Sequence, residues 1–81
     1  MQDVVAKVID SAAVMVGRAP SSITAQSRFF EDLGFDSTTI LELLMQLETD
    51  LDFDFDPDTL EADDFQSVET LARYVAARSR V

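Results

Sequence analysis

The spacing of apolar residues is the feature that most restricts how this chain can fold. Three stretches, residues 2–17, 37–51 and 67–79, carry apolar side chains at the spacing of one face of an α-helix. One other stretch, residues 51–55, alternates apolar residues with aspartate, as a half-buried strand does. Because the chain has no second alternating run to pair with such a strand, we interpret this stretch as an extended loop. The pattern therefore predicts an all-α fold.

A long connection separates the first two predicted helices. Gly17 is expected to end the first helix, and Pro20 and Gly34 prevent a continuous helix through the segment that follows. Its apolar residues are expected to anchor the loop on the core: Ile23, Phe29, Phe30 and Leu33.

The second predicted helix, residues 37–51, has one apolar face and an acidic remainder. The side chains expected on or near the buried face are Ile40, Leu41, Leu44, Leu47 and Leu51. The acidic side chains expected toward solvent are Glu42, Glu48 and Asp50.

Two local signals complete the predicted fold. Pro57 is expected to start a short helix near residues 58–64, because proline suits the first helical turn. Ser67 suits the N-cap of the last helix, whereas Thr70 occupies the position where a capping box needs Glu or Gln. We therefore expect one domain, residues 1–81, folded as a small four-helix bundle of three main helices and a short third helix, with a long first loop.

The side chains that carry most catalytic chemistry are missing. The chain has no cysteine and no histidine, which removes the usual nucleophilic thiol and the usual general base. Its one lysine, Lys7, is far in sequence from the best-placed hydroxyl, that of Ser37. A bundle of 81 residues also has little room for a cleft that excludes water. We therefore expect a protein that is not an enzyme.

The charge is unevenly distributed. Thirteen of the sixteen acidic residues, and none of the six basic ones, lie between positions 31 and 64. This acidity argues against nucleic-acid binding, which needs a basic surface, and favours partners with basic patches. No signal peptide or apolar run of about 18 residues is present, so no membrane span is expected and a cytoplasmic monomer is predicted. Met1 and the lack of a flanking linker favour a freestanding protein.

The aspartate-rich stretch from Asp50 to Glu61 has the length of a calcium-binding loop. Asp50 would stand at its first position and Glu61 at its last, bidentate position. Phe55, however, occupies the sixth position, where the sharp turn needs glycine. We therefore expect no dedicated metal site, only weak divalent binding that follows from the charge density.

The Asp36-Ser37 pair stands at the predicted start of the second helix. Either side chain can cap the helix by accepting a hydrogen bond from a backbone N–H group. A helix N-terminus also favours a phosphate ester, since its free N–H groups and its dipole stabilise the anion. The residues alone therefore leave Ser37 open as a cap or as a site of modification.

From its first predicted helix to its last, the chain resembles the acyl carrier proteins. The most specific part of the resemblance is the string Glu31, Asp32, Leu33, Gly34, Phe35, Asp36, Ser37, preceded by Phe30 and followed by an acidic amphipathic helix. Further matching residues are Ile23, Thr24, Ser27, Glu42, Leu43, Met45, Leu47, Glu48, Ser67 and Val68.

The resemblance implies a role for Ser37. In that family a separate phosphopantetheinyl transferase moves 4′-phosphopantetheine from coenzyme A to this serine, with the preceding Asp36 as its motif partner. The terminal thiol of the arm then holds acyl groups as thioesters. Helix 37–51 would dock acyl-loading, condensing or modifying enzymes through their basic patches. The candidate docking residues are Thr38, Thr39, Glu42 and Glu48.

Two departures from the family pattern favour a specialised pathway, such as polyketide or hybrid natural-product biosynthesis. Thr38 and Thr39 replace the usual leucine and the frequent acidic residue after the serine. The loop 52–57 is longer than in fatty-acid carriers and contains Phe53 and Phe55, which we interpret as core anchors. Two alternatives remain open: a freestanding aminoacyl or peptidyl carrier protein, and an unmodified acidic interaction or calcium-binding module.

Overall fold

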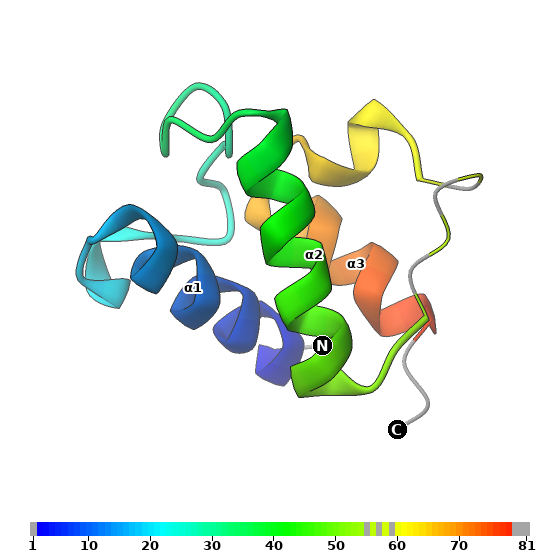
Figure 1. The fold of residues 1–81 in the computed structure, drawn as a ribbon. Coiled ribbons are helices and arrows are strands. Elements are labelled where there is room, and N and C mark those ends of the chain that lie inside the picture. The colour runs from blue at the N-terminus through cyan, green and yellow to red at the C-terminus, as the bar shows by residue number, and fades with distance from the viewer. Residues whose placement is uncertain (1, 55, 57, 59, 79–81) are drawn as a thin grey trace.

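Helices are the only regular secondary structure in the part of the chain that is described. A computed structural model describes residues 2–54, 56, 58 and 60–78, and Figure 1 shows its arrangement. The elements in chain order are α1 (Gln2–Val16), the 3₁₀ helix η1 (Pro20–Ser22), α2 (Ser37–Leu51), the 3₁₀ helix η2 (Ala62–Phe65) and α3 (Val68–Arg78). These described residues contain no β-strand. The predicted all-α fold, with three main helices, a short third helix and a long first loop, is confirmed.

One hydrophobic core holds the three main helices together. In Figure 1, α1 and α3 lie on either side of α2, and α1 packs against both of them. The buried hydrophobic residues are Val8, Ala12, Ala13, Ile23, Phe29, Leu33, Phe35, Ile40, Leu43, Leu44, Leu47, Phe53, Val68, Leu71, Ala72, Tyr74 and Val75. Every connecting segment longer than a turn contributes to this core, which is how so short a chain buries enough apolar surface to fold.

The first loop is anchored on the core much as its sequence predicts. Ile23, Phe29 and Leu33 are buried, and Gly17 ends α1 with a φ of 69°. The expectation that Phe30 is buried is wrong, because 41% of this residue is exposed. Residues 29–32 form a turn, in which the backbone N–H groups of Asp32 and Leu33 both donate to the Arg28 carbonyl. The two phenylalanines therefore point in different directions, and only Phe29 enters the core. Phe30 instead places its ring edge-on to that of Phe65, with the centroids 5.9 Å apart.

The buried face of α2 differs from the predicted one at two positions. Ile40, Leu44 and Leu47 are buried as expected, but 47% of Leu41 is exposed and Leu43 is fully buried in its place. Each residue turns 100° around an α-helix, so the stripe that contains positions 40, 44 and 47 also contains position 43 and excludes position 41.

The short third helix starts later in the chain than the predicted range, residues 58–64, does. The 3₁₀ helix η2 begins at Ala62, and the Asp64 carboxylate accepts a hydrogen bond of 2.8 Å from the backbone N–H of Glu61 just before it. This contact sets the start of η2, because it satisfies a donor that the helix cannot. The expectations for Pro57 and for Phe55 as a core anchor, and the predicted end of the last helix at Ser79, lie outside the described residues.

A reciprocal pair of hydrogen bonds starts α3. The Ser67 hydroxyl accepts from the backbone N–H of Thr70 at 3.3 Å, which confirms Ser67 as the N-cap. The Thr70 hydroxyl in turn accepts from the backbone N–H of Ser67 at 2.9 Å. Thr70 thus fills the role that Glu or Gln plays in a capping box, although its residue type argued against one.

Candidate functional site

The N-terminus of α2 is capped by Asp36. One oxygen of its carboxylate accepts hydrogen bonds from the backbone N–H and from the hydroxyl of Thr39, both at 2.8 Å. The backbone of Asp36 is extended, and its carbonyl accepts the first helical bond, from the N–H of Ile40 at 3.0 Å. The backbone N–H of Thr39, and then its hydroxyl, lower the pKa of the Asp36 carboxyl group because both bonds stabilise the charged form.

Ser37 is left unused by the cap. It is the first residue of α2, it is exposed, and its hydroxyl makes no hydrogen bond within the described part of the chain. The choice between Asp36 and Ser37 as the capping residue is therefore resolved in favour of Asp36. The result is an exposed hydroxyl at the positive end of a fifteen-residue helix, where a phosphate ester is electrostatically favoured.

The turn that leads to Ser37 is held firmly by the core. Phe35 and Leu33 are buried on either side of Gly34. The φ of Gly34 is 71°, a backbone angle that residues with a side chain rarely adopt. The ring of Phe35 lies 5.2 Å from that of Phe29, and its backbone N–H donates to the Phe29 carbonyl at 2.9 Å. We did not predict a role for Phe35, although an apolar residue between a turn glycine and a capping aspartate is the available signal.

Two acidic residues of the motif string have structural partners in this turn. The carboxylate of Asp32 accepts the backbone N–H of Arg28 at 2.9 Å, and Glu31 forms an ion pair of 2.7 Å with the Arg28 guanidinium. The hydrogen bond and the charge of Glu31 raise the pKa of Arg28. These local contacts close the loop before Gly34. Two of the acidic residues in the motif string therefore stabilise the turn.

The predicted docking residues do not share one face of α2. Thr38 and Glu42 are exposed, whereas Thr39 and Glu48 are half-buried. The hydroxyl of Thr39 is already bonded to Asp36. Glu42 and Glu48 are six residues apart, which places them about 120° apart around the helix. Of the four, Glu42 is the one that lines the space between α1 and α2.

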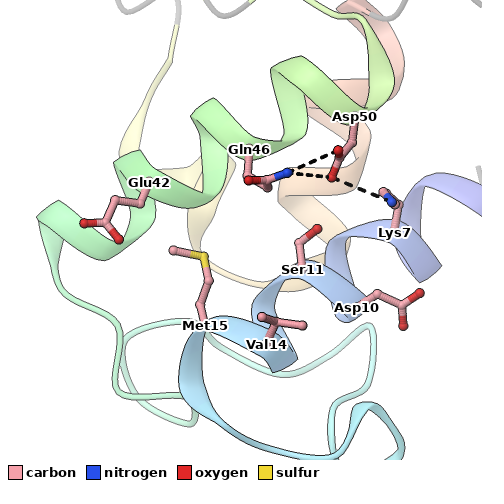
Figure 2. Close-up of a pocket in the computed structure, with 8 residues that line it drawn as sticks. All are labelled: Lys7, Asp10, Ser11, Val14, Met15, Glu42, Gln46 and Asp50. Carbon is pink, nitrogen blue, oxygen red and sulfur yellow. Dashed lines mark hydrogen bonds and ion pairs between the residues drawn. The ribbon is translucent and has the colours of Figure 1, made fainter.

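A groove lies between α1 and α2, and it has a volume of about 490 Å³. We call it the α1–α2 groove; its lining residues, drawn in Figure 2, are Lys7, Asp10, Ser11, Val14, Met15, Glu42, Gln46 and Asp50. No sequence pattern predicts this groove, because it depends on how two helices that are separated in the sequence are placed.

Neither a metal-binding cluster nor a membrane-spanning helix occurs among the described residues. The described residues contain no group of three or more carboxylates arranged to hold a metal ion, so the aspartate-rich stretch forms no such cluster there. In the same part of the chain, each helix is too short or too polar to cross a bilayer.

Comparison with known proteins identifies close relatives. The family described as "Phosphopantetheine attachment site" matches residues 6–75. The acyl carrier protein of Clostridium acetobutylicum is 38% identical over 73 residues, which cover 90% of this chain and 92% of the relative. That of Rickettsia massiliae is 36% identical, covering 89% and 81%. That of Bdellovibrio bacteriovorus is 32% identical, covering 91% and 92%.

Proposed function

The chain belongs to the acyl carrier protein family, and from that premise we propose that Ser37 is the residue to which its 4′-phosphopantetheine group is attached. Proteins of this family are carriers and not catalysts. Their covalently attached 4′-phosphopantetheine supplies a terminal thiol that holds acyl groups as thioesters. The observation that carries the proposal is the division of roles at the start of α2: Asp36 caps the helix, and the Ser37 hydroxyl stays exposed, with no hydrogen bond to any described residue.

The local structure supports Ser37 in this role over the other hydroxyls nearby. Thr39 donates its hydroxyl to Asp36, so its oxygen is held within the cap. Thr38 is exposed, but it is a bulkier secondary alcohol. Ser37 combines exposure, a primary hydroxyl and a turn fixed by buried neighbours on the approach, which presents it in one position to a transferase.

Acyl carrier proteins work with phosphopantetheinyl transferases and with acyl-handling enzymes. We propose that these partners approach the exposed part of α2 near Ser37, where Thr38 and Glu42 are accessible and Glu48 lies further along the helix. The many carboxylates between positions 31 and 64 support partners with basic patches, which long-range attraction would steer toward this surface. Thr39 would contribute through the cap that it shares with Asp36.

We also propose that the acyl groups belong to a specialised pathway, such as polyketide biosynthesis. The support is Thr38, which is exposed beside the attachment residue and replaces the leucine usual in the family. An exposed hydroxyl in place of an apolar contact weakens docking to enzymes built to bury a leucine there. The proposed setting is a cytoplasmic monomer.

Intact mass spectrometry tests the attachment site. The protein is incubated with coenzyme A and a broad-specificity phosphopantetheinyl transferase, and its mass is expected to rise by one phosphopantetheine group. Ser37→Ala should abolish the gain, whereas the matched variant Thr38→Ala should keep it. A gain that persists in Ser37→Ala would reject Ser37 as the site.

The same assay tests the pathway proposal. With a transferase from fatty-acid synthesis, Thr38→Leu should raise kcat/KM by about tenfold, since an apolar contact of leucine size is worth about 1–2 kcal/mol. Thr49→Leu, an exposed position at the far end of α2, is the control and should leave kcat/KM unchanged. Equal rates for Thr38→Leu and the unaltered protein would contradict the proposal.

A further inference from the structure

The α1–α2 groove contains the most exposed large apolar side chain of the described residues. Val14 is 83% exposed, and Met15 lies beside it, partly buried against the core. Figure 2 shows both on α1, with the Met15 side chain extending toward the helix that carries Glu42 and Gln46. An apolar side chain left in water in a groove marks a surface that a partner can cover.

Carboxylates surround this apolar centre. Glu42 of α2 and Asp10 of α1 lie on opposite sides of Val14 in Figure 2, and Asp50 lies at one end. The groove has one cation, Lys7, whose ammonium lies 3.7 Å from the carboxylate of Asp50. Within the described chain, neither Asp10 nor Glu42 forms an ion pair. The groove therefore keeps two uncompensated negative charges.

The Asp50 end of the groove is closed by side-chain contacts. The Gln46 amide donates to both carboxylate oxygens of Asp50 at 3.2 Å, in addition to the ion pair with Lys7. The ion pair joins α1 to α2 at this end, whereas the two Gln46 bonds lie within α2 and hold the Asp50 carboxylate in place. An incoming cation therefore finds its partners at Asp10 and Glu42, next to Val14.

The size and openness of the groove suit a helix better than a small molecule. From Lys7 to Val14 the floor runs about two helical turns, or roughly 10 Å. A small ligand needs a pocket that buries most of its surface, and a groove whose apolar centre is 83% exposed does not provide one. A third helix can lie along two packed helices, with its apolar stripe between them.

We propose that the α1–α2 groove docks a basic amphipathic helix of an acyl-handling partner enzyme. Its apolar stripe would cover Val14 and Met15, and its Lys or Arg side chains would pair with Asp10 and Glu42. The identity of the partner as an acyl-handling enzyme rests on the proposed function. The groove and its charge are features of the structure and do not depend on that function. A second copy of this chain, with its net charge of −10, is repelled. An anionic phosphodiester arm is likewise disfavoured beside Asp10 and Glu42.

An NMR titration tests this proposal with a defined probe. The ¹⁵N-labelled protein is titrated with a synthetic peptide of leucine, lysine and alanine, about 14 residues or roughly four turns long, patterned as an amphipathic helix. The largest amide shift changes are expected at residues 10–15 and 42–50. A peptide of the same composition in scrambled order, and one with glutamate in place of lysine, should bind at least about tenfold more weakly.

Matched variants separate the groove from the rest of the acidic surface. Val14→Ser should raise the Kd by about fivefold, and Asp10→Asn by about twofold to threefold at low salt. The controls are Met45→Ser, which removes an exposed apolar side chain of α2 outside the groove, and Asp3→Asn, which removes a carboxylate from the first turn of α1. Both controls should leave the Kd unchanged. Because Val14 is exposed, its variant keeps the fold, which an unchanged melting temperature verifies.

Several results would overturn the inference. They are the absence of binding, shifts centred on Leu41, Met45 and Glu48, or an equal loss of affinity in Met45→Ser and Val14→Ser. Groove amides that shift with protein concentration would instead indicate a second copy, and amides that shift on attachment of phosphopantetheine would indicate the arm. The mass assay on the same sample keeps the two proposals apart, since modification without peptide binding rejects the groove alone.

Discussion

At the scale of single residues, the start of α2 has a carboxylate that caps the helix, that of Asp36, and an exposed hydroxyl beside it, that of Ser37. The hydrogen bonds from Thr39 hold the pKa of Asp36 below its usual range. A carboxyl group whose pKa is lower in the folded than in the unfolded protein stabilises the fold at pH values above its unfolded pKa, about 3.9 for aspartate. That stabilisation is lost as the pH falls through the folded pKa. The cap is therefore acid-sensitive.

This pH dependence distinguishes two substitutions of Asp36. Asp36→Ala removes the acceptor for both bonds and should lower the melting temperature at pH 7. Asp36→Asn keeps a hydrogen-bond acceptor that does not titrate. The difference in melting temperature between this variant and the unaltered protein should therefore shrink as the pH falls below about 3.9. Melting followed by circular dichroism at several pH values measures both effects. If the difference in melting temperature between Asp36→Asn and the unaltered protein does not change with pH, this account is contradicted.

The neighbourhood of Ser37 also shows which single residues the sequence can assign. The family string and the Asp-Ser pair predict Ser37 as the attachment residue, which stays a prediction, and the structure places this serine, exposed, at the start of α2. The choice of Asp36 as the cap was not accessible, because both side chains can accept the same type of bond. Phe30 was misassigned for a similar reason: two adjacent phenylalanines have equal hydrophobicity, and only the path of the loop decides which one enters the core.

At the scale of elements, the bounds of α2 were predicted correctly from the sequence, whereas its buried face was predicted only in part. Its bounds, Ser37–Leu51, equal the predicted ones because a capping residue and a periodic run fix them. Its faces were less certain, since apolar residues at positions 40, 41, 43, 44 and 47 allow more than one buried stripe. Packing in the common core selected Leu43 over Leu41. The α1–α2 groove lies beyond sequence reasoning for the same reason.

The segment between α2 and η2 is joined to α3 by one tyrosine. Tyr74 is the only tyrosine of the chain, and its hydroxyl donates to the Asp56 carbonyl at 3.1 Å and accepts the Asp56 N–H at 3.3 Å. Phe53 is buried in the core, as expected, and anchors the segment nearer to α2. Side chains of this kind replace the strand pairing that an alternating sequence would otherwise need.

Removal of the Tyr74 hydroxyl should loosen this segment while the core stays packed. Tyr74→Phe keeps the ring and leaves two part-buried backbone groups of Asp56 without this partner, at a cost of about 1–2 kcal/mol. Amide hydrogen exchange at Asp56 should become faster, and the exchange of the α2 amides should follow only the small loss in global stability.

The control for Tyr74→Phe lies on the same helix. Glu69→Gln breaks an exposed ion pair of 2.6 Å with Arg73, which is worth about 1 kcal/mol at most. This variant should leave exchange at Asp56 unchanged. If Tyr74→Phe has no larger effect at Asp56 than Glu69→Gln, the two hydrogen bonds do not hold the segment.

At the scale of the whole molecule, the charge opposes the compact fold. The net charge is −10, and the three ion pairs found in the described chain engage two of the carboxylates between positions 31 and 64, those of Glu31 and Asp50. The molecule measures 28 × 23 × 19 Å, so its carboxylates lie within about 30 Å of one another, which is the screening length at 0.01 M salt. At low ionic strength nearly all of them repel.

Salt should therefore stabilise the protein. Raising the ionic strength from 0.01 to 0.15 M shortens the screening length to about 8 Å, and relief of about 1 kcal/mol of repulsion would raise the melting temperature by roughly 4–8 °C. Magnesium should act at lower concentration than sodium because of its double charge. Sucrose, which is uncharged, controls for effects of solute exclusion. A melting temperature indifferent to both salts would mean that these carboxylates are too well solvated to strain the fold, and their density would then serve partner recognition alone.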